Sequence, residues 1–211
     1  MTDIEVRAQT MAEALKKKVT TLQNKKELEE ICVICVDVSG SMNGACGSSN
    51  RIEVVRRSIP FLRAGNRWIG YSLVDFDSES HIVQELTTAF SNIVVNVDML
   101  IPRGQTSYAA GLTKSLEVFK DRISQKKRII LLSDGGNNTD LREMPSVIAQ
   151  CREMGVVVDT IAFGEEADLN QLRDLAAQTG GVFKQANSPL ALEQTYRELN
   201  FDVRWIEHKT V

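Results

Sequence analysis

The stretch from Ile31 to Ser41 reads ICVICVDVSGS. Its first six residues are all apolar, which is typical of a strand that is buried on both faces, as in a parallel sheet. Asp37, Ser39 and Ser41 follow, one carboxylate and two hydroxyls spaced two residues apart. Parallel sheets bind ligands at the carboxyl ends of their strands, and oxygen groups suit Mg²⁺, Mn²⁺ or Ca²⁺ rather than Zn²⁺. The stretch therefore predicts a metal site, although alone it also fits a turn or a phosphatase-like nucleophile.

Strand and helix patterns alternate along the chain from residue 31 onward. Strands are predicted at 31–36, 68–76, 81–86, 128–133, 156–163 and 182–184, and helices at 51–62, 90–100, 107–122, 141–154, 169–178 and 190–199. The short link 77–80 indicates an antiparallel hairpin. The pattern predicts a doubly wound α/β fold whose six-stranded sheet is mostly parallel, with one antiparallel edge strand and helices on both faces.

Both ends of the chain lie outside this pattern, which gives three segments: 1–30, the α/β domain 31–200, and the tail 201–211. Apolar residues recur at three- and four-residue steps over 3–29, which predicts one long helix. This helix either docks on the domain or joins a dimer or partner helix through coiled-coil packing. The tail is either docked or a partner-binding segment.

Composition narrows the class of protein. The 211 residues are 43% hydrophobic, as expected for one globular domain, and the net charge of −3 argues against nucleic acid as the main partner. The N-terminus is acidic and lacks the apolar segment of a signal peptide, and no apolar run reaches the roughly 20 residues of a membrane helix. A cytoplasmic protein is expected, with no membrane partner.

The four cysteines are interpreted as free thiols of a reducing compartment. Cys32 and Cys35 are three residues apart on a strand, so their side chains point to opposite faces and cannot share a zinc ion or form an easy disulfide. Cys46 lies in a small, polar loop, residues 43–50, and is the thiol expected to be most exposed.

Two further segments complete a family resemblance. Thr106 lies in GQTS (104–107), just before a predicted helix, and Asp134 lies in LLSDG (131–135), at the end of a predicted strand. Together with Asp37, Ser39 and Ser41, they resemble the metal-ion-dependent adhesion site of von Willebrand factor A domains. Residues 160–164 and 168–181 are similar to the late part of the same family. In overall size the chain resembles the stand-alone intracellular family members of the tellurite-resistance type. This resemblance implies a role in a stress response.

The resemblance implies a non-enzymatic protein-binding module. Asp37, Ser39, Ser41, Thr106 and Asp134 would hold Mg²⁺, with Mn²⁺ or Ca²⁺ as alternatives, and a partner's Asp or Glu would complete the coordination. Neutral hydroxyl ligands would leave the ion enough positive character to attract that carboxylate. Gly40 and Gly135 are expected to provide tight turns and to bring the backbone close to the ion. Asp140 is expected to cap the helix that follows it, with a role near the ion as the less favoured alternative.

Three catalytic alternatives compete with this interpretation. A metal-dependent phosphohydrolase using Asp37 is the main one, but Ser39 stands where phosphatases of the haloacid-dehalogenase type have a second aspartate. The Gly-rich segment after residue 40 lacks the Gly-Lys-Ser/Thr ending of a P-loop. The only histidines, His81 and His208, are not at strand ends where they could serve a serine nucleophile.

Overall fold

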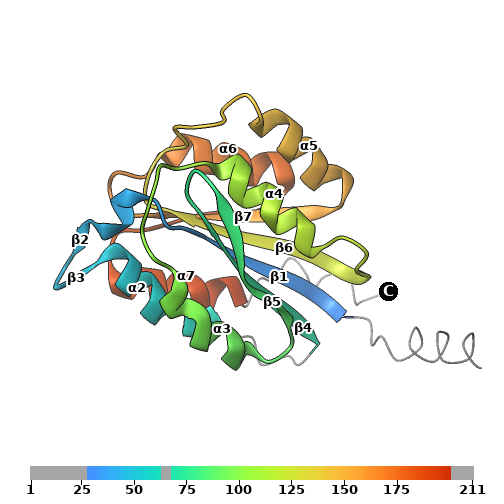
Figure 1. The fold of residues 1–211 in the computed structure, drawn as a ribbon, viewed down its shortest axis with the longest axis horizontal. Helices are drawn as coiled ribbons and strands as arrows, with labels where there is room; N and C mark the ends of the chain where they lie inside the picture. Colours follow the sequence, from blue (N-terminus) through green and yellow to red (C-terminus); the bar gives the residue numbers. More distant parts are fainter. Residues whose placement is uncertain (1–27, 63–67, 201–211) are drawn as a thin grey trace, which may run out of the picture.

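The computed structural model describes residues 28–62 and 68–200 and contains a six-stranded sheet with the order β5-β4-β1-β6-β7-β8 (Figure 1). The strands are β1 (Leu28–Asp37), β4 (Ile69–Phe76), β5 (Ser80–Thr87), β6 (Ser124–Ser133), β7 (Val156–Phe163) and β8 (Phe183–Ala186). Only β5 runs antiparallel, at one edge, paired with β4. The predicted fold class is confirmed.

The central strand β1 is longer than the sequence predicted. It begins at Leu28 because its backbone pairs on one side with β4 and on the other with β6, where Leu28 faces Ser124. Leu28 and Glu29 are therefore strand residues, and the prediction of a helix that continues to residue 29 is wrong at its end. The rest of that helix and the tail 201–211 lie outside the described residues.

Helices cover both faces of the sheet. One face carries α4 (Tyr108–Val118), α5 (Met144–Glu153) and α6 (Leu169–Thr179), and the other carries α2 (Arg51–Ser58), α3 (Phe90–Asn96) and α7 (Pro189–Asn200) (Figure 1). Each face has its own apolar cluster, and Cys32 belongs to one while Cys35 belongs to the other. Their predicted opposite orientation and their burial as free thiols are confirmed.

Prolines shift two predicted helix boundaries. The helix expected at 51–62 is α-helical only to Ser58 and continues as the 3₁₀ turn Ile59–Leu62, because Pro60 has no N–H for an α-helical hydrogen bond. Pro145 lies in the first turn of α5, so that helix begins at Met144 rather than at Leu141.

The segment 43–50, predicted as a loop, instead contains a small hairpin. Strands β2 (Ala45–Cys46) and β3 (Ser49–Asn50) pair antiparallel, and Gly47 has a positive φ in the turn between them. The described part of the chain contains no helix with the length and apolar character needed to cross a membrane.

Candidate metal centre

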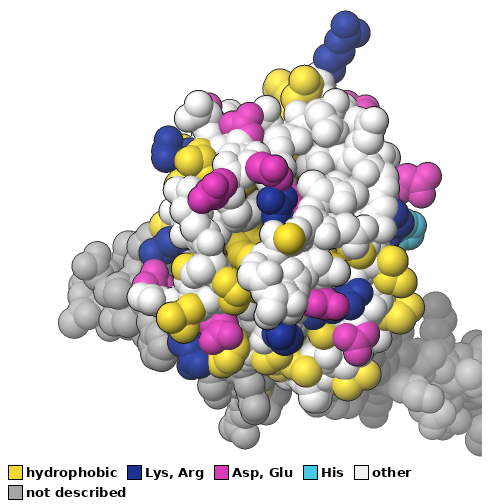
Figure 2. Space-filling view, turned by 90° about the vertical axis from the view of Figure 1, so that its left-hand side faces the viewer, with side chains coloured by type: hydrophobic (Ala, Val, Ile, Leu, Met, Phe, Trp, Pro, Cys, Tyr) yellow, Lys and Arg dark blue, Asp and Glu magenta, His cyan; other side chains and the backbone are white. Residues whose placement is uncertain are grey.

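The five predicted ligand residues meet at the carboxyl edge of the sheet. Asp37 is the last residue of β1, Ser39 and Ser41 lie at the 3₁₀ helix η1 (Gly40–Asn43), and Asp134 directly follows β6. Since β1 and β6 are neighbouring parallel strands, their carboxyl ends lie side by side. Thr106 joins them from the segment before α4. Figure 2 views this edge of the molecule, where acidic side chains gather beside a basic side chain within a largely uncharged surface.

Hydrogen bonds join the first and third motifs into one cluster. Ser41 Oγ donates to Asp134 Oδ1 at 2.7 Å and lies 3.0 Å from Ser39 Oγ. Because the single hydroxyl proton of Ser41 is directed at Asp134, Ser39 is the donor in the serine pair. Ser39 precedes η1 but its side chain does not cap it. Both hydroxyls therefore keep lone pairs that are available to a cation.

Thr106 is oriented by its backbone. Its N–H donates to Asn138 Oδ1, and its carbonyl oxygen accepts from the backbone N–H of Asn138 and Thr139. A Cβ atom placed on Gly135 would lie 3.7 Å from Thr106 Oγ1 and 3.8 Å from Ser41 Oγ. The hydroxyls of the first and second motifs thus border the same space beside the third.

The donor set fits a hard divalent cation. Three hydroxyl and two carboxylate side chains are grouped here, and four of these residues are buried: Asp37, Ser39, Thr106 and Asp134. Oxygen-only ligands of this kind suit Mg²⁺, Mn²⁺ or Ca²⁺. No cluster of three or more His, Cys, Asp or Glu side chains suited to a metal ion occurs within residues 28–62 and 68–200.

Burial raises the pKa of Asp37 to about 6. Hydrogen bonds from Ser133 Oγ and from the Ser39 backbone N–H oppose that rise, while the negative charge of Asp134 adds to it. Ser133 is the last residue of β6, and sequence reasoning missed it. Its only sequence signal is its position one residue before Asp134.

Arg51 is the second residue that sequence reasoning missed. Its Nη1 donates to Asp134 Oδ2 at 2.7 Å, and its Nη2 donates to Glu166 Oε2 at 2.8 Å. The Arg51 side chain is only 12% exposed, whereas that of Glu166 is 72% exposed. Burial lowers the pKa of the guanidinium, but the bonds to Asp134 and Glu166 outweigh this and leave the pKa above its usual value.

Ion pairs of Arg103 hold the segment that precedes Thr106. Arg103 forms an ion pair with Asp75 at 2.9 Å and with Asp77 at 3.2 Å. The neighbouring Gly104 has a φ of +61°, and its carbonyl oxygen accepts a hydrogen bond from the Gly40 N–H at 3.1 Å. The tight turn is therefore at Gly104. Gly40 and Gly135 do not have a positive φ, so their role in the turns of the site stays a prediction.

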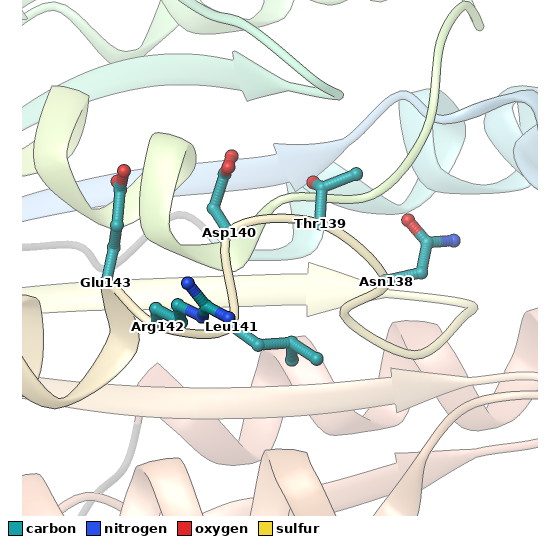
Figure 3. Close-up of a pocket in the computed structure, with 6 residues that line it drawn as sticks. All are labelled: Asn138, Thr139, Asp140, Leu141, Arg142 and Glu143. Carbon is teal, nitrogen blue, oxygen red and sulfur yellow. The ribbon is translucent and has the colours of Figure 1, made fainter.

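The loop after Asp134 forms one rim of the site. Asp140 does not cap α5, contrary to the prediction: its carboxylate accepts a hydrogen bond from Ser107 Oγ at 2.9 Å, and its φ is +54°. Ser107 in turn caps α4 by accepting from the Ala110 N–H. Residues 138–143 line an open pocket here, in which the side chains of Asp140 and Glu143 point to one side and Leu141 points away from them (Figure 3).

These features define a class of protein. The sheet order and the helices on both faces are those of a doubly wound α/β domain, and Ser, Thr and Asp side chains are grouped at the carboxyl edge of its sheet. A family model described as von Willebrand factor type A domain matches residues 32–137, half of the chain. The chain belongs to this family, whose members are metal-dependent interaction modules.

Individual proteins show the same similarity. The chain is 28% identical over 176 residues to the calcium-activated chloride channel regulator 1 of Bos taurus. The matched region covers 78% of this chain and 18% of that protein. A von Willebrand factor type A protein from Catenulispora acidiphila superimposes with a TM-score of 0.71 at 21% identity, over 82% of this chain and 42% of that chain. The chain therefore spans less than half the length of either protein.

A second similar structure comes from the mussel byssus. It is proximal thread matrix protein 1 with a zinc-occupied adhesion-site motif. Its TM-score is 0.68 at 22% identity, over 82% of this chain and 45% of that chain. At this level of identity, the similarity shows that the two chains share a fold.

Proposed function

We propose that this domain binds a divalent metal ion and, through it, an acidic side chain of a protein partner. Asp37, Ser39, Ser41, Thr106 and Asp134 are the proposed ligands. The observation that carries the proposal is the meeting of three separate segments, each contributing oxygen donors, at one edge of the sheet. When bound, the ion supplies a positive centre that attracts a carboxylate.

The ion is proposed to be Mg²⁺, with Mn²⁺ or Ca²⁺ as alternatives. Mg²⁺ needs six oxygen ligands at about 2.1 Å and usually keeps several waters, so hydroxyls together with carboxylates are sufficient. The zinc reported at the corresponding motif of the mussel protein makes Zn²⁺ a necessary competitor in the binding experiment.

The arrangement around Asp37 supports binding rather than phosphoryl transfer. A phosphatase of the type considered above needs a general acid two residues after its nucleophile. That position is Ser39, whose hydroxyl is hydrogen-bonded to Ser41. Hydrolysis of p-nitrophenyl phosphate by the wild-type protein, abolished in Asp37→Asn, would contradict the binding proposal.

Isothermal titration calorimetry with Mg²⁺, Mn²⁺ and, as the competitor, Zn²⁺ tests the metal site. We expect saturable binding to the wild-type protein and none to Ser39→Ala/Ser41→Ala. The matched control is Ser48→Ala/Ser91→Ala, which removes two exposed hydroxyls from other parts of the surface and should bind as the wild type does. Equal binding by the two double variants would overturn the assignment of the ligands.

The partner is tested by affinity capture. Wild-type protein in Mg²⁺ is compared with wild-type protein in EDTA and with Asp37→Ala in Mg²⁺. A partner that uses the metal is retained in the first condition alone. The Asp and Glu residues of the captured partner are then substituted one at a time. Substitution of the residue that binds the metal should abolish retention.

A further inference from the structure

Arg51 places a positively charged side chain at a helix position that is unfavourable for a cation. It is the first residue of α2, and the N-terminus of a helix carries a partial positive charge that repels a cation. The guanidinium is instead stabilised by the buried carboxylate of Asp134. A local preference that is overridden in this way often marks a functional position.

The surroundings of Arg51 are shaped to admit its side chain. A Cβ atom on Gly44 would lie 3.3 Å from Arg51 Cζ, and a Cβ atom on Gly164 would lie 3.5 Å from Arg51 Nε. The guanidinium therefore lies against two glycine residues, one after η1 and the other after β7. It donates to Asp134 Oδ2, whereas Ser41 donates to the other oxygen of the carboxylate, Oδ1.

We propose that Arg51 is the charge-setting residue of the metal site. This inference rests on the proposed function. Asp134 is shared between Arg51 and the ion, so the guanidinium cancels one of the two negative charges that would otherwise attract the cation. It also holds Asp134 Oδ2, which keeps that carboxylate from binding the ion through both oxygens.

The consequence concerns both affinity and partner recognition. A site with two uncompensated carboxylates would bind the ion tightly and neutralise it. With Arg51 in place the ion is held more weakly and retains more of its positive charge for an outside carboxylate. Glu166 moderates the effect, because it pairs with the other side of the guanidinium at the exposed edge of the site.

The test is calorimetric titration of metal-depleted protein with Mn²⁺ and, separately, with Mg²⁺. We expect Arg51→Gln to bind the ion on the order of tenfold more tightly than the wild type, given one unit charge removed close to the site. Arg51→Lys keeps the charge and should bind within about twofold of the wild type. Arg57→Gln is the matched control: it removes an equal charge from an exposed position on the same helix and should also leave binding within about twofold.

The outcomes separate the two proposals. If the wild type binds metal but Arg51→Gln binds equally or more weakly, the role of Arg51 is overturned while the metal site stands. Tighter binding by Arg51→Lys would also overturn it, because charge would not be the cause. If neither the wild type nor Arg51→Gln binds an ion, both proposals fail.

A second variant covers the case in which Arg51→Gln does not fold. Glu166→Gln changes an exposed side chain and leaves the pair between Arg51 and Asp134 intact. Since the guanidinium then loses its outer counter-charge, we expect metal binding to weaken about two- to threefold, with a discount for solvent screening. Tighter binding by Glu166→Gln would contradict the proposal.

Discussion

Ser133 Oγ donates a 2.5 Å hydrogen bond to Asp37 Oδ2, across two neighbouring strands and a sequence separation of 96 residues. The last residue of β6 thereby fixes the last residue of β1. The other oxygen of Asp37 accepts from the Ser39 backbone N–H at 2.7 Å. The carboxylate is thus held in one orientation before any ligand arrives.

In the metal-free protein the buried charge of Asp37 lowers the free energy of unfolding at neutral pH, and Asp37→Asn should remove this effect. Burial raises the pKa of Asp37 from 3.8 to about 6. The native state therefore binds more protons than the unfolded state between these values, and the contribution of Asp37 to stability falls as the pH rises from about 4 to 6. In EDTA at pH 7.5, Asp37→Asn should raise the free energy of unfolding by up to about 3 kcal/mol.

The measurement is urea unfolding of the wild type and the variant at pH 7.5 and again at about pH 3, below the pKa of Asp in the unfolded state. The advantage of Asp37→Asn should disappear at the lower pH, where the carboxyl group is protonated in both states. The exposed Asp98→Asn serves as control. An identical gain at both pH values would show that a buried charge is not the cause.

Gly104→Ala should damage the site through the turn that carries Thr106. Alanine is strained at the positive φ of Gly104, and its Cβ would lie 2.6 Å from Asp77 Oδ2. We expect a loss of about 2–4 kcal/mol in the free energy of unfolding, the sum of strain and overpacking, together with weaker metal binding. Unfolding and calorimetric titration measure the two effects.

The matched control for this variant is Gly47→Ala. Gly47 has nearly the same φ, +64°, but its Cβ would meet nothing within 4 Å. It should lose only about 1 kcal/mol and bind metal normally. Similar behaviour of the two variants would show that the contact with Asp77 does not matter.

One of the four thiols should react with a thiol reagent in the native protein, and the other three should not. Cys46 is partly exposed on β2, whereas Cys32, Cys35 and Cys151 are buried. Burial raises the pKa of Cys35 to about 12 and that of Cys151 to about 11, so neither forms the reactive thiolate at neutral pH. Ellman's reagent should titrate one thiol in the native protein and four in denaturant.

Cys46→Ser should remove the native signal without changing stability. A fast reaction of the native Cys46→Ser protein would contradict the burial of the other three. The assay is also independent of metal, which makes it a check on folding for each variant above.

Asp159→Ala should strongly destabilise the fold, away from the metal site. Asp159 Oδ2 lies 2.5 Å from Arg128 Nε, and both side chains are buried. Asp159 also accepts a hydrogen bond from the Val182 N–H at 2.7 Å. Its removal leaves a buried cation without its closest counter-charge, which typically costs about 3–5 kcal/mol. Urea unfolding measures this.

Lys184→Ala is the comparison for Asp159→Ala, because it breaks a surface pair between Lys184 and Glu198. Pairs of this kind contribute little to stability, so the midpoint of unfolding should hardly move. A comparable loss in both variants would argue that burial does not govern the strength of these pairs.

The local sequence was sufficient to predict the six strands of the main sheet, the class of fold and the residues that are proposed as metal ligands. Local signals are sufficient for this, because a buried parallel strand is a short apolar run and its last residues face the carboxyl edge of the sheet. The spacing from Asp37 to Ser41 indicated three candidate donors, and the family resemblance of the segments around Thr106 and Asp134 added those two residues. Helix ends were less well predicted, since Pro60 and Pro145 act through backbone hydrogen bonds that periodicity does not show.

The surroundings of those residues depend on contacts that only the folded chain makes. Arg51 and Asp134, Ser133 and Asp37, and Ser107 and Asp140 are pairs of residues far apart in sequence. They meet because β1 lies between β4 and β6, an order that depends on the packing of the whole sheet rather than on any one segment. The charge and the shape of the candidate site therefore follow from long-range contacts, whereas the proposed oxygen ligands could be predicted from three short stretches of sequence.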